Sequence, residues 1–300
     1  MEGGRAGTRC SGVTAIEATT VSGGARSALG RSAALRRLVK SGPSQHLIQT
    51  ARGARAVRES QRFALRQFGG RRVAGYTLRE SSRRIHLRHG ARDVAVLNEI
   101  YGGTGGRNCY EPPASVAGVL DAHPALRVLD VGANIGLFSM FALERWPDGT
   151  VIGLEPDPGN FELLSRTVAD NDFGGRWQVE RLAAFNAPGR VPFAAGLYSD
   201  AHIAEPGAAD TIEVPAVDFF VQARGIDLIK MDIEGGEWPI LTDPRLRELE
   251  AAVLVLEWHR RGCPGPDPYG AVLSLLAGAG YASTHEVENH GESGVLWAWR

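Results

Sequence analysis

The sequence has few cysteines and no long hydrophobic run, and both absences restrict what the protein can be. Its three cysteines, Cys10, Cys109 and Cys263, are far apart and odd in number, and none belongs to a CxxC pair. They exclude a disulfide framework, give no sign of a structural zinc site and favour a reducing compartment. No segment reaches the ~18–20 uncharged apolar residues that span a bilayer, so we expect no transmembrane helix and a cytoplasmic protein.

Lysine is almost missing as well, and the basic residues that are present are unevenly distributed. The chain of 300 residues has a formal net charge of −1, yet residues 1–92 hold 18 Arg and one Lys against four acids, which gives +15. Residues 93–300 hold 14 basic and 30 acidic residues, which gives −16. This split predicts a basic arm joined to an acidic folded body. The arm would suit a nucleic acid or an anionic surface, although a general preference for Arg gives the same composition.

Residues 1–70 are poor in the side chains that build a core. Residues 1–30 consist mainly of Gly, Ser, Thr and Ala, so we expect them to be disordered. Residues 31–68 mix scattered Leu, Val and Phe with many arginines in an intermittent helical pattern. We therefore expect residues 1–70 to form a basic extension that is disordered or partly helical. An organelle transit peptide and a misassigned translation start are both compatible with this composition.

From residue 71 onward the hydrophobic pattern indicates alternating strands and helices. We expect short strands within 73–78 and 85–87 and a helix over 91–101. Beyond residue 127, short apolar runs alternate with helical stretches, which predicts a parallel sheet with crossover helices. The expected strands are 127–131, 150–154, 177–182, 227–231 and 251–256, and the expected helices are 137–145, 159–169, 217–224 and 269–279. Residues 282–286 and 294–299 face each other across a polar turn and predict an antiparallel pair at the edge.

The segment VLDVGANIGLFS, residues 128–139, carries the strongest signal for a ligand. A strand ends at Asp130, and Gly132, Asn134 and Gly136 follow in a tight turn that leads into a helix. Glycines there let the backbone approach a ligand closely, and the N–H groups of the helix start attract electron-rich atoms. A dinucleotide-binding turn would read GxGxxG, and the carboxylate of Asp130 would repel a pyrophosphate. The cationic groups of S-adenosylmethionine (SAM) suit this turn better.

A second acid supports a nucleoside site. Glu155 ends the second strand, 19 residues after Gly136, where an acid in dinucleotide-binding folds accepts hydrogen bonds from the ribose. Asp130 alone would serve as a turn stabiliser, and Glu155 alone as an exposed loop acid. Because the two acids stand at successive strand ends, we favour a cofactor site. Its predicted residues are Asp130, Gly132, Asn134, Gly136, Glu155 and Asp232.

With these residues in view, residues 71–300 resemble the FkbM-type SAM-dependent methyltransferases, a branch of the class I methyltransferase fold. The segments VGANIGLFS, EPDPGNFELL and IKMDIEGGEW look like the family's three most recognisable blocks, and the third is the most specific. The resemblance implies a Rossmann-like α/β fold with a mostly parallel seven-stranded sheet, an antiparallel edge strand and helices on both faces. It also implies a lead-in at 71–126, a SAM-binding domain at 127–300, and methyl transfer to a hydroxyl of a sugar or secondary metabolite.

The third block contributes a second group of acids. Asp232 and Glu234 follow the fourth strand, and Glu257 and His259 follow the fifth, so these residues should meet at one rim of the sheet. A hydroxyl acceptor needs a base, and we predict Asp232, Glu234 and His259 as catalytic residues, with His259 favoured because it titrates near neutrality. If a divalent ion such as Mg²⁺ is used, its candidate ligands are Asp232, Glu234, Glu257 and His259.

Three neighbouring residues are expected to have structural roles. Lys230, inside the fourth strand, should pair with an acid, and Trp238 should pack beneath the strand-end loop. Asp218 should cap or orient the loop before the fourth strand. Residues 194–210 should form part of the wall of the acceptor pocket.

Two other functions remain open. Adenine amino-methyltransferases carry a (D/N)PP(Y/F) motif after the fourth strand, where this chain has DIEGGE, so methylation of a base is disfavoured. The alternatives are an RNA-directed methyltransferase guided by the basic arm and a non-catalytic SAM-binding protein. We expect a small-molecule hydroxyl acceptor as the partner, with nucleic acid as the weaker alternative. The sequence contains no clear oligomerisation signal.

Overall fold

The computed structural model describes residues 42–70, 72–102, 108–123 and 125–300. The chain divides into two compact units, residues 1–46 and 47–300, and the second unit is described below. The disorder expected for residues 1–30 lies outside the described residues. Within the part of the chain that is described, no helix has the length and apolar character needed to cross a membrane.

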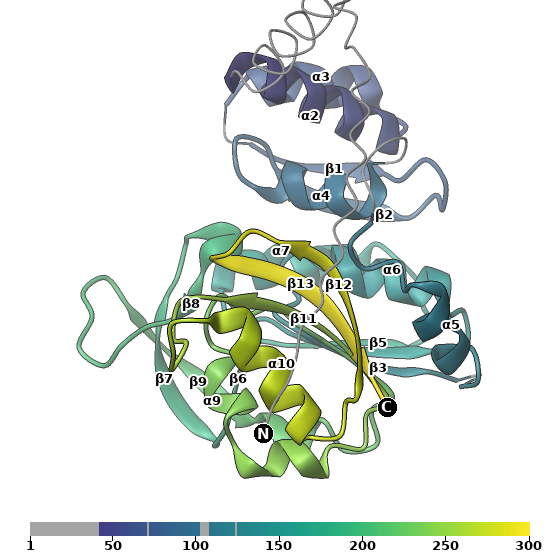
Figure 1. The fold of residues 1–300 in the computed structure, drawn as a ribbon. Helices are drawn as coiled ribbons and strands as arrows, with labels where there is room; N and C mark the ends of the chain where they lie inside the picture. The colour runs from purple at the N-terminus through teal and green to yellow at the C-terminus, as the bar shows by residue number, and fades with distance from the viewer. Residues whose placement is uncertain (1–41, 71, 103–107, 124) are drawn as a thin grey trace, which may run out of the picture. The chain divides into compact units, whose positions relative to one another are not determined.

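A seven-stranded sheet forms the centre of the second unit (Figure 1). Its strands lie in the order β12-β13-β11-β10-β3-β4-β5. The five strands from β11 to β5 are parallel, whereas β13 pairs antiparallel with both β11 and β12. The strands are β3 (Arg127–Val131), β4 (Thr150–Leu154), β5 (Trp177–Glu180), β10 (Leu228–Met231), β11 (Val253–His259), β12 (Ser283–Asn289) and β13 (Ser293–Trp299). The predicted mostly parallel sheet with an antiparallel edge is confirmed.

Helices cover both faces of this sheet, which explains why its central strands are apolar at almost every position. Val128 and Leu228 belong to the core on one face. Leu129 and Ile229, their neighbours in the sequence, belong to the core on the other face. The helices of the first face are α4 (Asp93–Tyr101), α5 (Ala114–Leu120), α6 (Leu137–Arg145) and α7 (Pro158–Ala169). Those of the second are α8 (Phe219–Gln222), α9 (Trp238–Leu241), η2 (Pro244–Glu248) and α10 (Pro268–Gly278).

The strand order reverses between β3 and β10, and this reversal determines where a ligand can bind. From β3 the chain adds β4 and β5 on one side, and later β10 and β11 on the other. The ends of the two central strands are level, since Asp130 pairs with Lys230 and Val131 with Met231. In open α/β sheets, ligands bind beyond the carboxyl ends of the strands at such a reversal. The loops after β3 and β10 therefore meet at the expected position of a site.

A second, four-stranded sheet follows β5 in the chain, and the sequence patterns did not predict it. Its order is β6-β9-β7-β8, and its strands are β6 (Ala183–Phe185), β7 (Gly189–Ala194), β8 (His202–Ile203) and β9 (Ile212–Asp218). Val191, Phe193 and Val214 form its own small core. The strands are short, and Pro192 and Pro215 interrupt the alternation by which a strand is recognised.

The helix predicted at 217–224 is shorter than expected, because a strand of the second sheet occupies its first residues. Strand β9 continues to Asp218, so only Phe219–Gln222 is helical. The Asp218 side chain accepts a hydrogen bond from Phe220 N and caps this helix, as predicted.

The N-terminal boundary of the folded unit lies earlier than predicted. Helices α2 (Gly42–Ala56) and α3 (Ser60–Phe68) precede the hairpin of β1 (Val73–Thr77) and β2 (Arg84–Arg88). Val57 and Phe63 are fully buried in the core that also contains Tyr76, whose ring centre lies 5.1 Å from that of Phe63. The division predicted after residue 70 is therefore corrected to one near residue 46, because the apolar residues of 47–70 pack against strands that follow them.

Candidate functional site

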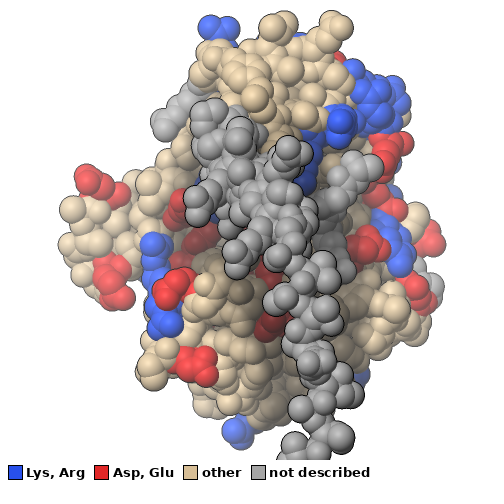
Figure 2. Space-filling model, turned by 45° about the horizontal axis from the view of Figure 1, so that its top comes forward, with Lys and Arg blue, Asp and Glu red and all other residues tan. Residues whose placement is uncertain are grey.

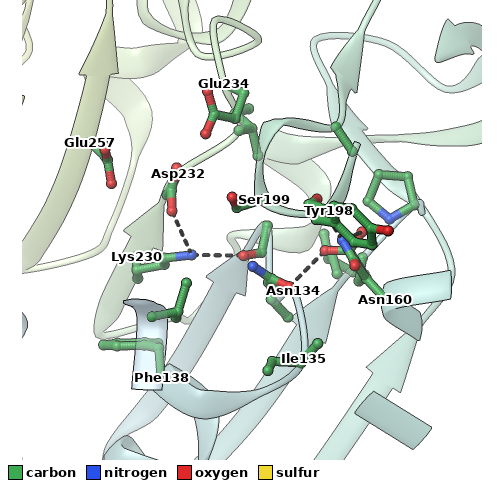
Figure 3. Close-up of a pocket in the computed structure, with 18 of the residues that line it drawn as sticks. Asn134, Ile135, Phe138, Asn160, Tyr198, Ser199, Lys230, Asp232, Glu234 and Glu257 are labelled. Atoms are coloured by element: carbon green, nitrogen blue, oxygen red, sulfur yellow. Dashed lines mark hydrogen bonds and ion pairs between the residues drawn. The ribbon is translucent and has the colours of Figure 1, made fainter. Parts of the chain in front are cut away.

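A cavity opens beyond the carboxyl ends of β3, β4, β10 and β11 (Figure 3). It encloses about 1110 Å³, a volume that includes open space at its mouth. Ile135, Leu137 and Phe138 are among its apolar lining residues. Its polar lining includes Asn134, Glu155, Lys230, Asp232, Glu234 and Glu257. The cavity therefore joins the glycine loop after β3 to the acids after β10 and β11.

Gly132 brings the two central loops into contact. Its φ of 82° lies in the left-handed region, and a Cβ there would lie 1.9 Å from the carbonyl oxygen of Asp232. Lys230 Nζ donates a hydrogen bond to the carbonyl oxygen of Gly132 at 2.7 Å, which ties the loop to β10. Glycine is therefore required both for the backbone conformation and for the close approach of the loops.

Glu155 and Asn134 are linked to each other and line the same cavity. The Glu155 carboxylate accepts hydrogen bonds from the backbone N–H groups of Asn134 at 2.7 Å and Asp157 at 2.8 Å. Burial raises the pKa of Glu155 to about 7, although these N–H groups oppose the shift. The buried Oδ1 atom of Asn134 has no hydrogen-bond partner among the described residues. A ligand in the cavity would therefore meet a carboxylate and an unsatisfied amide oxygen.

Two residues predicted to bind the cofactor lie behind the cavity. Asp130 is fully buried, and it accepts a hydrogen bond from Ser139 Oγ at 2.6 Å while Lys230 Nζ lies 3.3 Å from its other oxygen. Gly136 precedes α6 with a φ of 88°, and a Cβ there would lie 2.6 Å from Leu164 Cδ1. Neither is among the described residues that line the cavity. In this position Asp130 pairs with Lys230, and Gly136 permits close packing of α6. The cofactor-binding roles predicted for both residues stay predictions.

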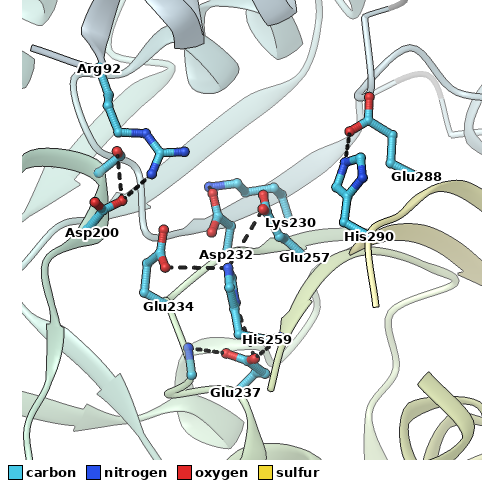
Figure 4. Close-up of polar contacts among 12 residues, drawn as sticks. Arg92, Asp200, Lys230, Asp232, Glu234, Glu237, Glu257, His259, Glu288 and His290 are labelled. Carbon is cyan, nitrogen blue, oxygen red and sulfur yellow. Dashed lines mark hydrogen bonds and ion pairs between the residues drawn. The ribbon is translucent and has the colours of Figure 1, made fainter. Parts of the chain in front are cut away.

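The acids that follow β10 and β11 converge on one imidazole (Figure 4). His259 Nε2 lies 3.4 Å from Glu234 Oε2 and 3.7 Å from Glu257 Oε1. On the cavity side, Lys230 Nζ lies 3.7 Å from Asp232 Oδ2, which confirms the acid pairing predicted for this lysine. The three carboxylates line the cavity, whereas His259 is not among its described lining residues. The sequence thus predicted correctly that these residues lie close together, but His259 lies behind the three carboxylates and does not line the cavity.

Two residues at the start of α9 hold His259 by its backbone. The Glu237 carboxylate is fully buried and accepts hydrogen bonds from His259 N at 2.7 Å and Gly235 N at 2.9 Å. Trp238 Nε1 donates to the carbonyl oxygen of His259 at 2.8 Å, so this tryptophan packs beneath the loop as predicted. Sequence reasoning did not assign Glu237 to the site, although its place next to Trp238 in the DIEGGEW block was a usable signal.

The loop between β7 and β8 forms part of the cavity wall, as expected for residues 194–210. It contains the short helix η1 (Tyr198–Asp200). Asn160 Nδ2 donates to the carbonyl oxygen of Tyr198 at 3.0 Å, and Arg92 pairs with Asp200 at 2.5 Å. Arg92 and Tyr198 both line the cavity. The sequence did not reveal Tyr198, because its loop joins strands of a sheet that was not predicted, nor Arg92, which precedes α4 far away in the sequence.

Comparison with known proteins shows which family has this arrangement. The methyltransferase FkbM domain matches residues 130–283, just over half of the chain. The chain belongs to the FkbM methyltransferase family. The predicted class I methyltransferase fold agrees with this assignment and with the seven-stranded sheet.

Individual relatives of this FkbM methyltransferase are distant. It is 26% identical over 175 residues to methyltransferase sdnD of Sordaria araneosa, an alignment that covers 45% of this chain and 67% of sdnD. It is 27% identical over 210 residues to the 31-O-demethyl-FK506 methyltransferase FkbM of Streptomyces tacrolimicus, covering 56% and 76%. The solved precorrin-6y C5,15-methyltransferase of Geobacter metallireducens is 16% identical, with a TM-score of 0.39, covering 66% of this chain and 90% of its own.

The charges in this FkbM methyltransferase decide which groups can act as a base. Burial alone would lower the pKa of His259, but Glu237, with Asp232 and Glu234, raises it to about 9. The imidazole is therefore protonated near neutrality, which does not support the role of base that was predicted for it. Burial raises the pKa of Glu234 to about 7, although His259 opposes this shift. Burial also raises the pKa of Glu257 well above its ordinary value.

Proposed function

We propose that this FkbM methyltransferase transfers the methyl group of SAM to a hydroxyl oxygen of a small-molecule acceptor. The observation that carries the proposal is that one cavity contains both Glu155, after β4, and the carboxylates that follow β10 and β11. A donor and an acceptor held in the same cavity can be oriented for direct transfer. Such orientation is worth up to roughly 7–11 kcal/mol of the barrier.

Asn134 and Glu155 suit the donor end of the cavity. Oε2 of Glu155 accepts one hydrogen bond, from Asn134 N, and keeps a lone pair for a ribose hydroxyl, whereas Oε1 accepts from both Asp157 N and Asn160 Nδ2. Asn134 Oδ1, which has no partner within the described chain, would accept a hydrogen bond from a further polar group of the donor. Ile135 and Leu182 line the same cavity and offer apolar surface to an adenine ring. When bound, SAM supplies a methyl group on a sulfonium sulfur, which keeps the electron pair of the C–S bond that breaks.

Glu234 suits the acceptor end. A hydroxyl is a weak nucleophile until a base takes its proton. Glu234 lines the cavity, and no described lysine or arginine lies within ion-pair distance of its carboxylate, so it is available to take that proton. Asp232, which faces Lys230, is placed to accept a hydrogen bond from the acceptor and orient it. Protonated His259 lies near Glu234 and Glu257 and compensates part of their charge.

A named relative and the distribution of surface charge favour a small-molecule hydroxyl acceptor over RNA. The relative from Streptomyces tacrolimicus is named for the methylation of an oxygen. On the described surface visible in Figure 2, basic and acidic side chains are interspersed rather than separated. A sugar or a secondary metabolite is therefore a better acceptor than RNA in this proposal.

A turnover experiment tests the proposal. The full chain is incubated with SAM and a panel of sugars, polyhydroxylated metabolites and RNA, and S-adenosylhomocysteine and methylated products are quantified by mass spectrometry. We expect methylation on oxygen, and Glu234→Gln should lower kcat by at least about 100-fold because general base catalysis contributes that much. Glu213→Gln, which alters an exposed acid of β9, is the matched control and should leave kcat unchanged.

Three results would contradict the proposal. They are preferential methylation of RNA, methylation only on nitrogen or carbon, and a Glu234→Gln variant with unchanged kcat. A chain that binds SAM but methylates none of the panel would favour the non-catalytic alternative.

A further inference from the structure

Tyr198, in the wall of the cavity, is held in an unfavourable backbone conformation. Its φ of 62° lies in the left-handed region, which bulky side chains rarely adopt. Five described residues other than glycine have a positive φ, and three of them, Asn134, Tyr198 and Glu234, line the cavity. Backbone strain of this kind persists only where the surrounding structure imposes it, and it gathers at functional sites. The proposed function uses Asn134 and Glu234 but gives Tyr198 no role.

Hydrogen bonds from the start of α7 hold the loop that carries Tyr198. Asn160 Nδ2 donates to the carbonyl oxygen of Tyr198 at 3.0 Å, and Asp157 Oδ2 accepts from Gly196 N at 2.6 Å. The same Nδ2 atom of Asn160 donates to Glu155 Oε1 at 3.5 Å. Asn160 therefore joins Tyr198 to the carboxylate that suits the ribose. Figure 3 shows Tyr198 beside Asn160, on the side of the cavity away from the acids that follow β10 and β11.

The Tyr198 ring packs on a guanidinium group that is itself fixed. Arg88 Cζ lies 4.6 Å from the centre of the ring. Arg88 Nε and Nη2 donate to the two carboxylate oxygens of Asp93 at 2.8 and 3.0 Å, and Nη2 also donates to Asn160 Oδ1 at 2.6 Å. Asp93 is 1% exposed, so this support is buried. Tyr198 lines the cavity, whereas Arg88 is not among its described lining residues, so the ring lies between the guanidinium and the cavity.

We propose that Tyr198 stacks on the adenine ring of SAM at the donor end of the cavity. The inference rests on the proposed function, which puts the ribose at Glu155 and therefore the base close to Tyr198. Every base has a face that packs on an aromatic side chain, and two aromatic rings prefer an offset stack. Because the backbone contacts and Arg88 already fix the ring, it loses little freedom when the base binds, and more of the contact energy appears as affinity.

Two ligands separate contact with the nucleoside from contact with the amino-acid end of SAM. The full chain is titrated calorimetrically with S-adenosylhomocysteine and with 5′-methylthioadenosine, which keeps the adenine and ribose but lacks the amino-acid end. We expect Tyr198→Ala and Tyr198→Leu to lower the affinity for both ligands about 5–150-fold, as loss of an aromatic ring under a base does. Tyr198→Phe keeps the ring and should bind both ligands as the unmodified chain does.

A spectroscopic signal distinguishes stacking from a merely structural role of the side chain. The ultraviolet absorption of adenine should decrease when 5′-methylthioadenosine binds to the unmodified chain and to Tyr198→Phe, because stacked bases absorb less. The decrease should be absent in Tyr198→Leu, even at ligand concentrations that saturate it. Tyr269→Ala is the matched control, because the ring of Tyr269 also packs on a neighbour, Trp258 at 5.8 Å, but Tyr269 is not among the described residues that line the cavity.

Three results would overturn the inference. They are unchanged affinity for both ligands in Tyr198→Ala and Tyr198→Leu, a loss confined to S-adenosylhomocysteine, and a loss in Tyr198→Phe as large as that in Tyr198→Ala. Circular dichroism establishes that each variant is folded, and the Leu and Phe variants keep the test decisive if Tyr198→Ala misfolds. Binding that does not depend on Tyr198 removes only the stacking, whereas an unmodified chain that binds neither ligand also loses the proposed function.

Discussion

Replacing Gly132 with alanine should destabilise the protein through two separable effects. The first is backbone strain, because a φ of 82° costs an L-residue about 1–2 kcal/mol. The second is overlap, because the new Cβ would lie 1.9 Å from the carbonyl oxygen of Asp232, and overpacking costs typically about 1–3 kcal/mol. The overlapping atom belongs to the backbone and moves only with the loop after β10. We therefore expect Gly132→Ala to lower the free energy of unfolding by about 2–5 kcal/mol.

Gly174→Ala isolates the first of these effects. Gly174 has a φ of 60°, and a Cβ there would meet nothing within 4 Å apart from its chain neighbours. This substitution should cost only about 1–2 kcal/mol. Urea unfolding of the unmodified chain and both variants, followed by circular dichroism, measures the difference. If Gly132→Ala is no more destabilising than Gly174→Ala, the two loops do not approach as described, and the reasoning about the site is refuted.

Three further predictions concern buried polar groups. Asp130→Asn removes the carboxylate nearest to the buried Lys230 and should lower the free energy of unfolding, measured in urea, by about 3–5 kcal/mol. A loss below about 1 kcal/mol would contradict the buried ion pair. Trp238→Phe deletes the hydrogen bond to the carbonyl oxygen of His259 and should cost about 1–3 kcal/mol in the same assay. Burial lowers the pKa of His89 from its ordinary 6.5 to about 4, so the folded state favours the neutral ring. The contribution of His89 to the free energy of unfolding should be constant above pH 6.5 and fall by up to about 3 kcal/mol between pH 6.5 and 4. Urea titrations of His89→Gln at the same pH values should not show this decline.

The large sheet was predictable because its signal is local. Leu228–Met231 is buried at every position, and short apolar runs of this kind between helical stretches are typical of parallel strands. Once the strands are known, topology alone places Glu155 and Asp232 at one rim, because the carboxyl ends of parallel strands meet at one edge. The cavity that contains both residues follows from this order of strands.

The features that the sequence did not reveal depend on contacts between distant residues. Asp130 stands at a strand end like Glu155, but Ser139 and Lys230 enclose it, and neither contact is visible in the glycine motif. The protonation of His259 depends on the buried carboxylate of Glu237, which comes from another strand-end loop. The second sheet was missed because β6 pairs with β9, some thirty residues later, and its strands are too short to show a clear period.

We predict that the cavity binds SAM with Glu155 at the donor end. Calorimetric titration of the full chain with SAM, S-adenosylhomocysteine and NAD tests this most directly. We expect saturable binding of SAM and S-adenosylhomocysteine. Glu155→Ala should lower the affinity for SAM about 10–100-fold, since a hydrogen bond to a charged group is worth about 1.5–3 kcal/mol. Glu162→Ala, which removes an exposed acid of α7, should bind SAM as the unmodified chain does. Preference for NAD over SAM, or an unchanged affinity for SAM in Glu155→Ala, would contradict SAM binding with Glu155 at the donor end.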